Sequence, residues 1–343
     1  MKKYIMDDSN RNIISTNDKK HAGSKARRDM EYFLSDAIPI YSKSISTKKM
    51  KKLWTVFKIK YIVNKSLVYV QYPLYMRDLY KTILYKGQKK RGIAIIHDLD
   101  CLRYKNRIKE IKKEIYFLNQ FSGIIAHNEK MIAWLKEQGC TVPMTSLELF
   151  DYYTKTNIIE VENLEIKLPY KVSFAGNLSK EKSEFIYKIK NLDNKNILWN
   201  LFGINYEDAV SDNIVYKGSF DPDNIPDDLC NSHFGLVWDG DSIKTCQGDI
   251  GEYQRYNNPH KCSLYLAAGI PVIVWEDAAI ATFVKENNVG ICIKSLEELD
   301  SILARLKESE YKLLKKNAIE LSKKVRSGYF IHNAIKQISN WKK

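Results

Sequence analysis

A lysine occurs in the first turn of a short predicted helix, where positive charge is unfavourable. The helix lies in YNNPHKCSLYLAAGIPVIVWED, Tyr256 to Asp277. Pro259 suits a first helical turn, an Asn at 257 or 258 can cap it, and Gly269 can supply a left-handed C-terminal residue. The free N–H groups at a helix N-terminus act as about half a positive charge, which favours a bound anion. Lys261 is therefore predicted to bind phosphate, and the alternative is a lysine that bends into solvent.

A second group of candidate ligands follows an apolar strand in FAGNLSKEKS, Phe174 to Ser183. The strand ends in Gly176-Asn177, and a helix follows. Such turns lie at the carboxyl edge of a parallel sheet, where ligands bind, and a glycine lets the backbone approach a phosphate. Lys180 and Lys182 can add cationic contacts. A turn of this kind often binds nothing. The prediction that this turn binds a ligand is therefore supported only by the presence of Lys261 in the same predicted domain.

Two aspartates follow another apolar strand in WDGDS, Trp238 to Ser242. Asp-x-Asp resembles a signature that holds a divalent ion on a diphosphate. Lysines are predicted to serve the phosphates here, so no metal site is expected. Asp239 and Asp241 then either accept hydrogen bonds from sugar hydroxyls or shape a turn.

The first half of the chain carries its own candidate catalytic group in GIAIIHDLD. His97, Asp98 and Asp100 come directly after a buried strand, at the sheet edge where catalytic groups gather. A carboxylate within hydrogen-bond reach of an acceptor hydroxyl suits a general base. The alternative is that Asp98 caps the next helix. His127 repeats this geometry more weakly, and the six histidines show no metal-ligand spacing.

The positive charge of the chain is concentrated in its first half. The first 160 residues hold 31 Lys and Arg against 16 Asp and Glu, and the rest hold 24 against 25. The stretch Lys43 to Val63 interleaves seven lysines with aromatic residues, which suits an anionic membrane surface. No recognised nucleic-acid module is present, and the alternative is a solvated lysine-rich surface. The basic helix start in HAGSKARRD, His21 to Asp29, is a further candidate for acceptor binding or cleft closure.

Composition and element pattern predict two α/β domains. The length of 343 residues exceeds one ordinary core, and 44% hydrophobic residues without a run of about 20 apolar residues predict a globular chain that does not cross a bilayer. No secretory signal is visible, and the six cysteines are widely spaced, so we expect a cytoplasmic protein with reduced thiols.

Short apolar runs alternate with helical patterns in both halves, as a parallel sheet with crossover helices requires. The predicted domains are 1–157 and 168–327, with a C-terminal helix at 328–343 that needs an apolar surface to cover and is expected to cross back to the N-terminal domain. A single long helix is predicted from about Leu296 to Val325.

Several of these runs together resemble one enzyme family. IIHDLD, FAGNLSKEKSEFIY, FGLVWDGDS and YNNPHKCSLYLAAGIPVIVWEDAAIATFV occur with the order and spacing found in bacterial β-1,6-galactofuranosyltransferases of O-antigen and capsule assembly. The likeness spans about His21 to Ser327 and is most specific from Val172 to Ile291. A weaker likeness, chiefly HD, FGLVW and LAAGIPVIV, extends to streptococcal glucosyltransferases that glycosylate serine-rich adhesins. Both groups imply the GT-B fold, an α/β architecture in which two Rossmann-like doubly wound domains face a cleft.

The resemblance also implies roles for individual residues. The nucleotide-sugar is expected in the C-terminal domain, with Lys261 and Lys180 on the donor diphosphate and the aspartates after Trp238 near the sugar. The uridine and phosphate pocket is expected to comprise Gly176, Asn177, Phe220 and Asn258. The loop form GDIGEYQRYNNPHK favours galactofuranose over glucose as the donor sugar.

The expected activity is an inverting transfer of galactofuranose from UDP-galactofuranose to a sugar hydroxyl of a cell-surface glycan precursor, through a β-linkage, 1,6 by resemblance. Asp98 is the expected base, with His97 or Asp100 as alternates, and no metal cofactor is expected. The expected partners are the UDP-sugar, a lipid-linked saccharide acceptor, the inner face of the plasma membrane and a second copy of the chain, but not nucleic acid. The alternatives are a UDP-glucose-dependent glucosyltransferase that acts on a glycoprotein or polysaccharide, and a sugar-nucleotide-binding subunit without catalysis.

Overall fold

The protein folds into two compact units. The structure, a computed structural model, describes residues 2–7, 22–41, 57, 59–61, 65–75, 78–86, 88, 91–157, 168–207 and 211–340. Unit 1 comprises Met1–Leu147 and Phe330–Lys343, and unit 2 comprises Glu148–Tyr329. Compared with the predicted limits, this division assigns residues 148–157 to unit 2 and the last helix to unit 1.

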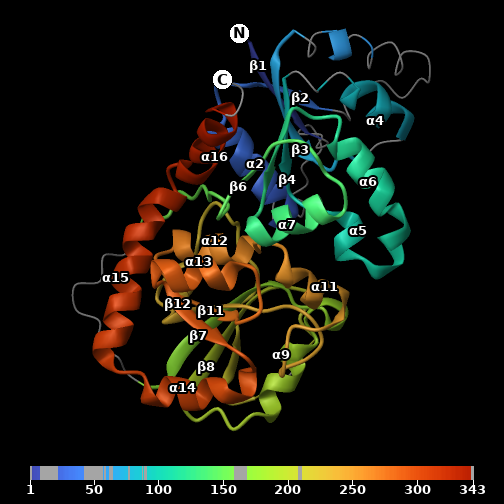
Figure 1. Ribbon diagram of the computed structural model, residues 1–343. Coiled ribbons are helices and arrows are strands. Elements are labelled where there is room, and N and C mark those ends of the chain that lie inside the picture. Colours follow the sequence, from blue (N-terminus) through green and yellow to red (C-terminus); the bar gives the residue numbers. More distant parts are fainter. Residues whose placement is uncertain are drawn as a thin grey trace. The chain divides into compact units, whose positions relative to one another are not determined.

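Unit 1 is built on a parallel sheet. Its six described strands have the order β2-β1-β3-β4-β5-β6. The strands are β1 (Lys3–Asp7), β2 (Ile38–Tyr41), β3 (Leu67–Tyr72), β4 (Gly92–Ile96), β5 (Gly123–Ala126) and β6 (Met144–Ser146). β4 is buried throughout, because helices cover both faces of the sheet. Figure 1 shows α4 and α6 together beside one face and α2 beside the other.

The helices of unit 1 follow the predicted crossovers. They are α2 (Ala22–Phe33), α4 (Asp78–Tyr85), α5 (Asp100–Arg103), the 3-10 helix η4 (Lys105–Glu110), α6 (Ile111–Leu118), α7 (Glu129–Glu137) and α16 (Tyr329–Asn340). The amphipathic α16 buries Phe330, Ile331, Ala334 and Ile338. The side chain of Ile338 lies against Gly123 of β5, and Thr145 donates a hydrogen bond of 2.5 Å to Gln337. α16 is therefore part of the unit 1 core.

Unit 2 has a second parallel sheet with the order β12-β11-β10-β7-β8-β9. Its strands are β7 (Tyr170–Asn177), β8 (Ile197–Ile204), β9 (Ile214–Tyr216), β10 (Phe234–Val237), β11 (Val272–Trp275) and β12 (Gly290–Ile293). Numbered within the unit, this is the order 3-2-1-4-5-6 of dinucleotide-binding sheets. The strand order reverses between the first and fourth strands, and this is the switch point where ligands bind. That switch point lies between β7 and β10.

The helices of unit 2 complete the doubly wound pattern. They are α8 (Lys180–Ser183), α9 (Phe185–Lys188), η5 (Ile189–Asn191), α10 (Asp227–Cys230), α11 (Gly248–Glu252), η6 (Tyr253–Arg255), α12 (His260–Ala267), α13 (Ile280–Asn287), η7 (Leu296–Glu298), α14 (Leu299–Arg305) and α15 (Glu308–Val325). α12 packs against α15 and β10. Both units are thus Rossmann-like, as predicted.

The predicted continuous helix from Leu296 to Val325 is wrong, because the chain breaks at Leu306-Lys307. Both residues are extended, with ψ of 120° and 146°. The N–H of Lys307 donates to the carboxylate of Glu310 at 3.0 Å, so a new helix starts there. A glutamate three residues after a cap position is a known start signal, and the sequence KESE carries it.

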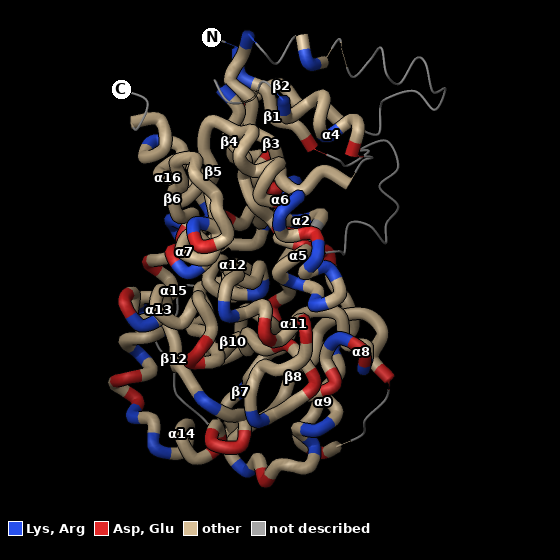
Figure 2. The backbone as a smooth tube through the Cα atoms, turned by 45° about the vertical axis from the view of Figure 1, so that its right-hand side comes forward, with Lys and Arg blue, Asp and Glu red and all other residues tan. Residues whose placement is uncertain are grey.

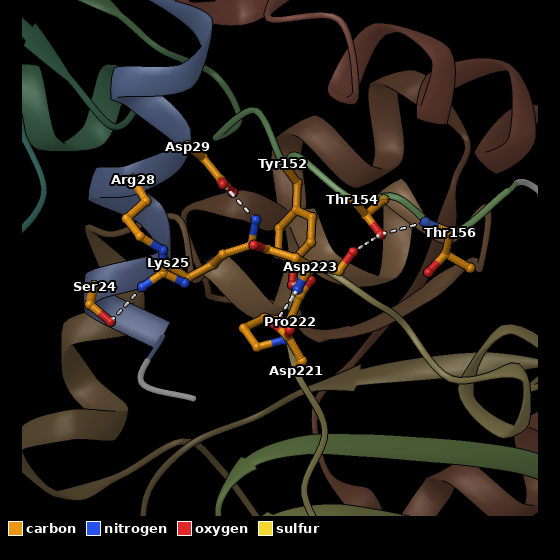
Figure 3. A network of polar contacts seen from close by, with 10 residues as sticks. All are labelled: Ser24, Lys25, Arg28, Asp29, Tyr152, Thr154, Thr156, Asp221, Pro222 and Asp223. Atoms are coloured by element: carbon orange, nitrogen blue, oxygen red, sulfur yellow. Dashed lines mark hydrogen bonds and ion pairs between the residues drawn. The ribbon is translucent and has the colours of Figure 1, made fainter. Parts of the chain in front are cut away.

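The segment that enters unit 2 is held tightly on it. The Tyr152 N–H donates to the Val325 carbonyl at 2.9 Å, and its hydroxyl donates to the Pro222 carbonyl at 3.0 Å. Thr154 donates to the Asp223 carbonyl at 3.1 Å and accepts from the Thr156 N–H at 3.2 Å (Figure 3). These contacts account for the inclusion of residues 148–157 in unit 2.

All six cysteines lie in the described ranges and are free thiols, five of them buried. Among the described helices, none is both long and apolar enough to span a membrane.

Candidate active site

Lys261 projects from the first turn of α12 into the switch point of unit 2. Its ammonium group lies 2.5 Å from Asp239 Oδ1, 3.3 Å from the Trp238 carbonyl and 4.8 Å from the centre of the Phe174 ring. The side chains of Lys261 and Asp239 are only 13% and 11% exposed. The unfavourable lysine of the first turn is thus compensated by a carboxylate that follows β10.

β7 and β10 separate at this point, and the place where they part is called the crevice below. Their pairing ends at Ser173 and Gly235, so the N–H of Ala175 finds no partner on β10 and instead donates to the Tyr265 hydroxyl at 2.7 Å. Tyr265 lies flat over Gly235, where an added Cβ would come within 2.1 Å of the ring. Burial raises the pKa of Tyr265 far above its usual value, so the phenol stays neutral.

Tyr265 also fixes the position of Lys261, since the two residues are one helical turn apart on α12. The helix ends as predicted: Gly269 has φ of 68°, its N–H donates to Leu266 at 3.0 Å, and the Ile270 N–H donates to Tyr265 at 2.9 Å. This is the Schellman arrangement. The sequence identified the ends of α12 but not the role of Tyr265, whose only signal is its spacing from Lys261.

The predicted asparagine cap of α12 is wrong. The N-cap residue is Pro259, and no side chain caps it. The Asn258 amide, 2% exposed, instead donates to the Glu148 carbonyl at 2.8 Å. Asn258 therefore fixes the loop before α12 and has its amide N–H engaged.

Asp239 is held from two sides. Its Oδ2 accepts a hydrogen bond of 3.2 Å from the amide of Gln254, which is 1% exposed. Gln254 also accepts a weak hydrogen bond from the Cys246 thiol at 3.8 Å. Sequence analysis did not single out Gln254, because nothing in the local pattern marks a glutamine that orients a carboxylate 15 residues away.

The loop that carries the two aspartates is folded compactly at two glycines. Added Cβ atoms at Gly240 and Gly251 would come within 2.2 Å of Gln247 and 2.6 Å of Cys246. Trp238 is fully buried and donates from its indole to the Ser242 carbonyl at 2.9 Å. The Asp241 carbonyl accepts from Lys188 at 2.6 Å, whereas its Oδ1 is buried without a hydrogen-bond partner. Asp241 therefore holds an acceptor that a ligand hydroxyl could satisfy.

Gly176 makes room for Lys261. A Cβ at this position would lie 3.1 Å from Lys261 Cε and 3.5 Å from the Phe174 ring. The neighbouring Asn177 accepts from the Ser179 N–H at 3.1 Å and from Asn205 at 3.0 Å. Its side chain thus organises the turn between β7 and α8.

The other two predicted ligands are engaged elsewhere in unit 2. Lys180 is 57% exposed, pairs with Glu207 at 2.7 Å and lies over the Tyr187 ring. Hydrogen bonding to Glu207 raises its pKa, so it stays charged. Phe220 packs edge-on against Phe202 of β8, with 5.8 Å between ring centroids. Among the described residues, Lys261 contacts Asp239, the Trp238 carbonyl and the Phe174 ring rather than either of these two, so the structure does not bring the two lysines together.

The predicted catalytic residues lie at the carboxyl edge of β4 in unit 1. Asp98 pairs with Arg103 at 2.9 Å and is 26% exposed, and Asp100 pairs with Arg107 at 2.8 Å. The N-cap of α5 is Leu99, without a side-chain cap, so the alternative of Asp98 as a helix cap does not hold. The N–H of His97 donates to the Tyr72 carbonyl at 2.8 Å. Its backbone continues the pairing of β3 and β4.

Two further residues surround this edge. Tyr75 is 61% exposed, and partial burial together with the charges of Asp100 and Asp98 raises its pKa above the usual value. Arg27 of α2 binds Asp7 at 2.6 Å and the carbonyls of Gln71 and Pro73 at 3.0 and 2.8 Å. Because β1 and β3 flank the switch point of unit 1, Arg27 bridges the carboxyl ends of the two strands at that point. It occurs in the basic stretch HAGSKARRD, which the sequence indicated without selecting this residue.

Two further polar features of unit 1 are buried and stabilise its fold. His127 is buried and its Nε2 lies 3.1 Å from the Ile96 carbonyl; burial lowers its pKa to about 4, so it is neutral at physiological pH. Lys25 and Asp29 form a buried ion pair of 2.5 Å within α2 (Figure 3). Of the stretch Lys43–Val63, only residues 57 and 59–61 belong to the described ranges, so the predicted basic surface lies almost entirely outside them.

Two doubly wound units, one with a lysine-bearing crevice at its switch point, correspond to the GT-B fold. Among solved structures, the Anabaena protein Alr3699/HepE in complex with UDP aligns with a TM-score of 0.63 over 99% of this chain and 100% of its own, at 12% identity. That likeness establishes the fold.

The chain belongs to the glucosyltransferase 3-like family. The N-terminal domain of that family matches residues 10–149, and its C-terminal domain matches residues 172–338. The chain is 30% identical over 340 residues to the β-1,6-galactofuranosyltransferase WbbI of Escherichia coli (strain K12), covering 93% of this chain and 95% of the relative. It is 27% identical to glucosyltransferase 3 of Streptococcus parasanguinis, over 69% of this chain and 67% of that protein.

Proposed function

We propose that the protein transfers galactofuranose from UDP-galactofuranose to a primary hydroxyl of a lipid-linked saccharide, with inversion. The donor sugar and the linkage follow the 30% identical relative named as a β-1,6-galactofuranosyltransferase. The observation that supports nucleotide binding most strongly is Lys261 in the crevice between β7 and β10. Ligands of doubly wound sheets bind at that point, and a lysine at a helix N-terminus suits a diphosphate.

The reaction is a direct displacement at the anomeric carbon. Asp98 accepts the proton of the acceptor hydroxyl, whose oxygen forms the new bond to C1 as the bond from C1 to the β-phosphate oxygen breaks. UDP leaves with the electron pair of that bond. The negative charge that develops on it is stabilised by Lys261 and the N-terminus of α12, groups that are already oriented before the reaction.

Lys261 has to exchange one anion for another in this scheme. With no ligand it pairs with Asp239, and the pair is nearly excluded from solvent. A diphosphate that enters the crevice offers two negative charges in place of one, so the lysine can turn from the carboxylate to the phosphate. Asp239, still held by Gln254, is then available to accept a hydrogen bond from a donor sugar hydroxyl, and the unpartnered Oδ1 of Asp241 is a second acceptor.

Lys180 has a secondary part in the proposal. Its ion pair with Glu207 is exposed on both sides, and exposed pairs contribute little to stability. The cost of moving Lys180 from Glu207 to a bound phosphate is therefore small. We expect it to join the donor site only when the nucleotide is present.

The proposed reaction is tested by offering the purified protein UDP-galactofuranose and UDP-glucose with a saccharide acceptor and analysing products by mass spectrometry and NMR. The proposal expects a β-galactofuranosyl product, and expects Asp98→Asn to lose at least about a hundredfold in kcat, the usual size of a general-base contribution. UDP affinity should be unchanged in that variant. A product formed only from UDP-glucose would refute the choice of donor.

A glucosyltransferase is the second candidate, because the streptococcal relatives carry that name. It shares the crevice and the base, but its donor is UDP-glucose and its acceptor is a glycoprotein or a polysaccharide. A nucleotide-sugar-binding subunit without catalysis would bind UDP and form no product with either donor, and Asp98→Asn would then change nothing.

A further inference from the structure

The surface formed by η4 and the outer side of α6 combines exposed cations with exposed apolar side chains. Every residue of η4 is exposed, including Ile108 at 56%. On α6 the exposed side carries Tyr116 at 51%, while Ile115, Phe117 and Leu118 are buried. Lys112 and Tyr116 lie one turn apart on α6, and together with the exposed Ile108 of the adjoining η4 they are called the stripe here.

A neighbouring helix extends this stripe. Lys113 of α6 pairs with Asp78 of α4 at 2.5 Å, which brings the two helices together. The next residue of α4, Leu79, is 62% exposed. The η4–α6 ridge, defined here as Leu79, Lys105, Arg107, Ile108, Lys109, Lys112 and Tyr116, therefore exposes three large apolar side chains within one part of unit 1.

The ridge is strongly basic. Between Lys105 and Tyr116 the chain has five Lys and Arg against Glu110 and the buried Glu114. Lys113 and Arg107 are paired with Asp78 and Asp100, whereas Lys109 and Lys112 have no acidic partner among the described residues. Figure 2 shows blue segments of the tube beside the labels α5 and α6.

We propose that the η4–α6 ridge binds the surface of an anionic phospholipid bilayer. Apolar side chains enter the region between headgroups and acyl chains, and lysines beside them bind the lipid phosphates while their aliphatic stems cover apolar surface. Exposed Leu79 and Ile108 favour this partner over nucleic acid, whose recognition requires cations and stacking aromatics but gains little from aliphatic side chains. None of the residues of the ridge belongs to the stretch Lys43–Val63, and the proposal does not depend on which sugar is transferred.

The test is sedimentation of the full chain with vesicles, either of phosphatidylglycerol and phosphatidylethanolamine or of phosphatidylcholine alone. We expect binding to the anionic vesicles only, weakening as salt is added. The double variant Ile108→Ser/Lys112→Glu should bind these vesicles about 30-fold less tightly. It makes the net charge of the ridge two units more negative and removes one apolar side chain. Leu313→Ser/Lys316→Glu is the matched control on α15, where Leu313 is 50% exposed, and it should bind like the unchanged protein.

UDP binding of all three proteins is measured by calorimetry. Equal UDP affinity shows that each protein is folded and that the vesicle result does not arise from a change at the donor site. The proposal is overturned if the unchanged protein ignores anionic vesicles, if both vesicle types bind it equally, or if the Ile108/Lys112 variant binds like the control. Binding of an oligonucleotide that only this variant loses, without vesicle binding, would assign the ridge to nucleic acid instead.

Discussion

At the scale of single residues, the charge balance and position of Lys261 are set by its neighbours more than by its place in the helix. Asp239 neutralises it, Gly176 leaves space for it, and Tyr265 holds the turn from which it projects. Replacing Asp239 should tighten UDP binding, whereas replacing Gly176 or Tyr265 should weaken it, so each neighbour can be tested by one substitution.

Replacing Asp239 by Asn should tighten UDP binding by about tenfold. The change removes a negative charge 2.5 Å from the lysine, and this charge competes with the incoming diphosphate in a poorly solvated crevice. Turnover should fall, because the acceptor for a donor hydroxyl is weakened. Calorimetry with UDP measures the first effect and a transfer assay the second; weaker UDP binding would mean that Asp239 is needed to hold Lys261 in place.

Gly176→Ala should weaken UDP binding with little loss of stability. The added methyl group would lie 3.1 Å from Lys261 Cε, and a flexible lysine moves aside more easily than backbone. Gly203→Ala is the contrasting variant: its Cβ would lie 1.8 Å from the Gly176 carbonyl oxygen, at φ of 152°, so it should lower the melting temperature sharply. Equal loss of stability in both variants would count against the proposed space for Lys261.

At the scale of elements, α12 is fixed to the sheet by a tyrosine that replaces a strand pairing. Tyr265→Phe should lower the free energy of unfolding by ~1–3 kcal/mol, because the buried Ala175 N–H loses its partner. Denaturant unfolding followed by fluorescence measures this. UDP affinity should fall as well, since Lys261 shares that helix; unchanged stability would show that water satisfies Ala175.

Helix α15 carries a buried cation that destabilises unit 2. Lys315 is 5% exposed, and burial lowers its pKa to about 8 from 10.5. The folded state thus binds this proton less tightly than the unfolded state does, so the penalty of ~3 kcal/mol is complete below pH 8 and disappears as the pH rises towards 10.5.

Lys315→Met should therefore stabilise the protein at pH 7. It should also remove the increase in stability that the unchanged protein shows as the pH rises from 8 towards 10.5. Thermal unfolding at pH values from 7 to 10 compares the variant with the unchanged chain. A variant that is less stable at pH 7 would mean that the lysine has an anionic partner in solution.

The sequence predicts some of these features and not others for physical reasons. Strands β4, β7, β10 and β11 are short β-branched or apolar runs bounded by turn residues, and α12 has a proline at its start and a glycine at its end, so local chemistry defines them. The partners Asp239, Gln254 and Tyr265 are brought to their positions by packing of separate elements, which no local pattern records. The break of the long helix at Lys307 was missed because apolar periodicity continues across it.

At the scale of the whole molecule, the two units divide the proposed chemistry. Unit 2 carries the crevice for the donor and unit 1 the carboxylate proposed as base. The roles of all the predicted site residues, Lys261 and Asp239 as well as Asp98, Lys180, Phe220 and Asn258, stay predictions, because the geometry fixes their positions and not their ligands.

Transfer should continue in the presence of EDTA. In the proposed site a lysine and a helix N-terminus stabilise the leaving diphosphate, so chelation should leave kcat within about twofold. The transfer assay is run with EDTA and with added Mg²⁺. A loss that Mg²⁺ restores would contradict a metal-independent departure of UDP.

The most direct test of the account is calorimetry of UDP binding to the unchanged protein and to Lys261→Ala. The account predicts binding by the unchanged protein and a loss of about tenfold to a hundredfold in the variant, the value of one charge-assisted contact to phosphate of ~1.5–3 kcal/mol. The variant should remain folded, with a lower melting temperature because Asp239 loses its buried partner. Equal UDP affinity in the two proteins would contradict the account.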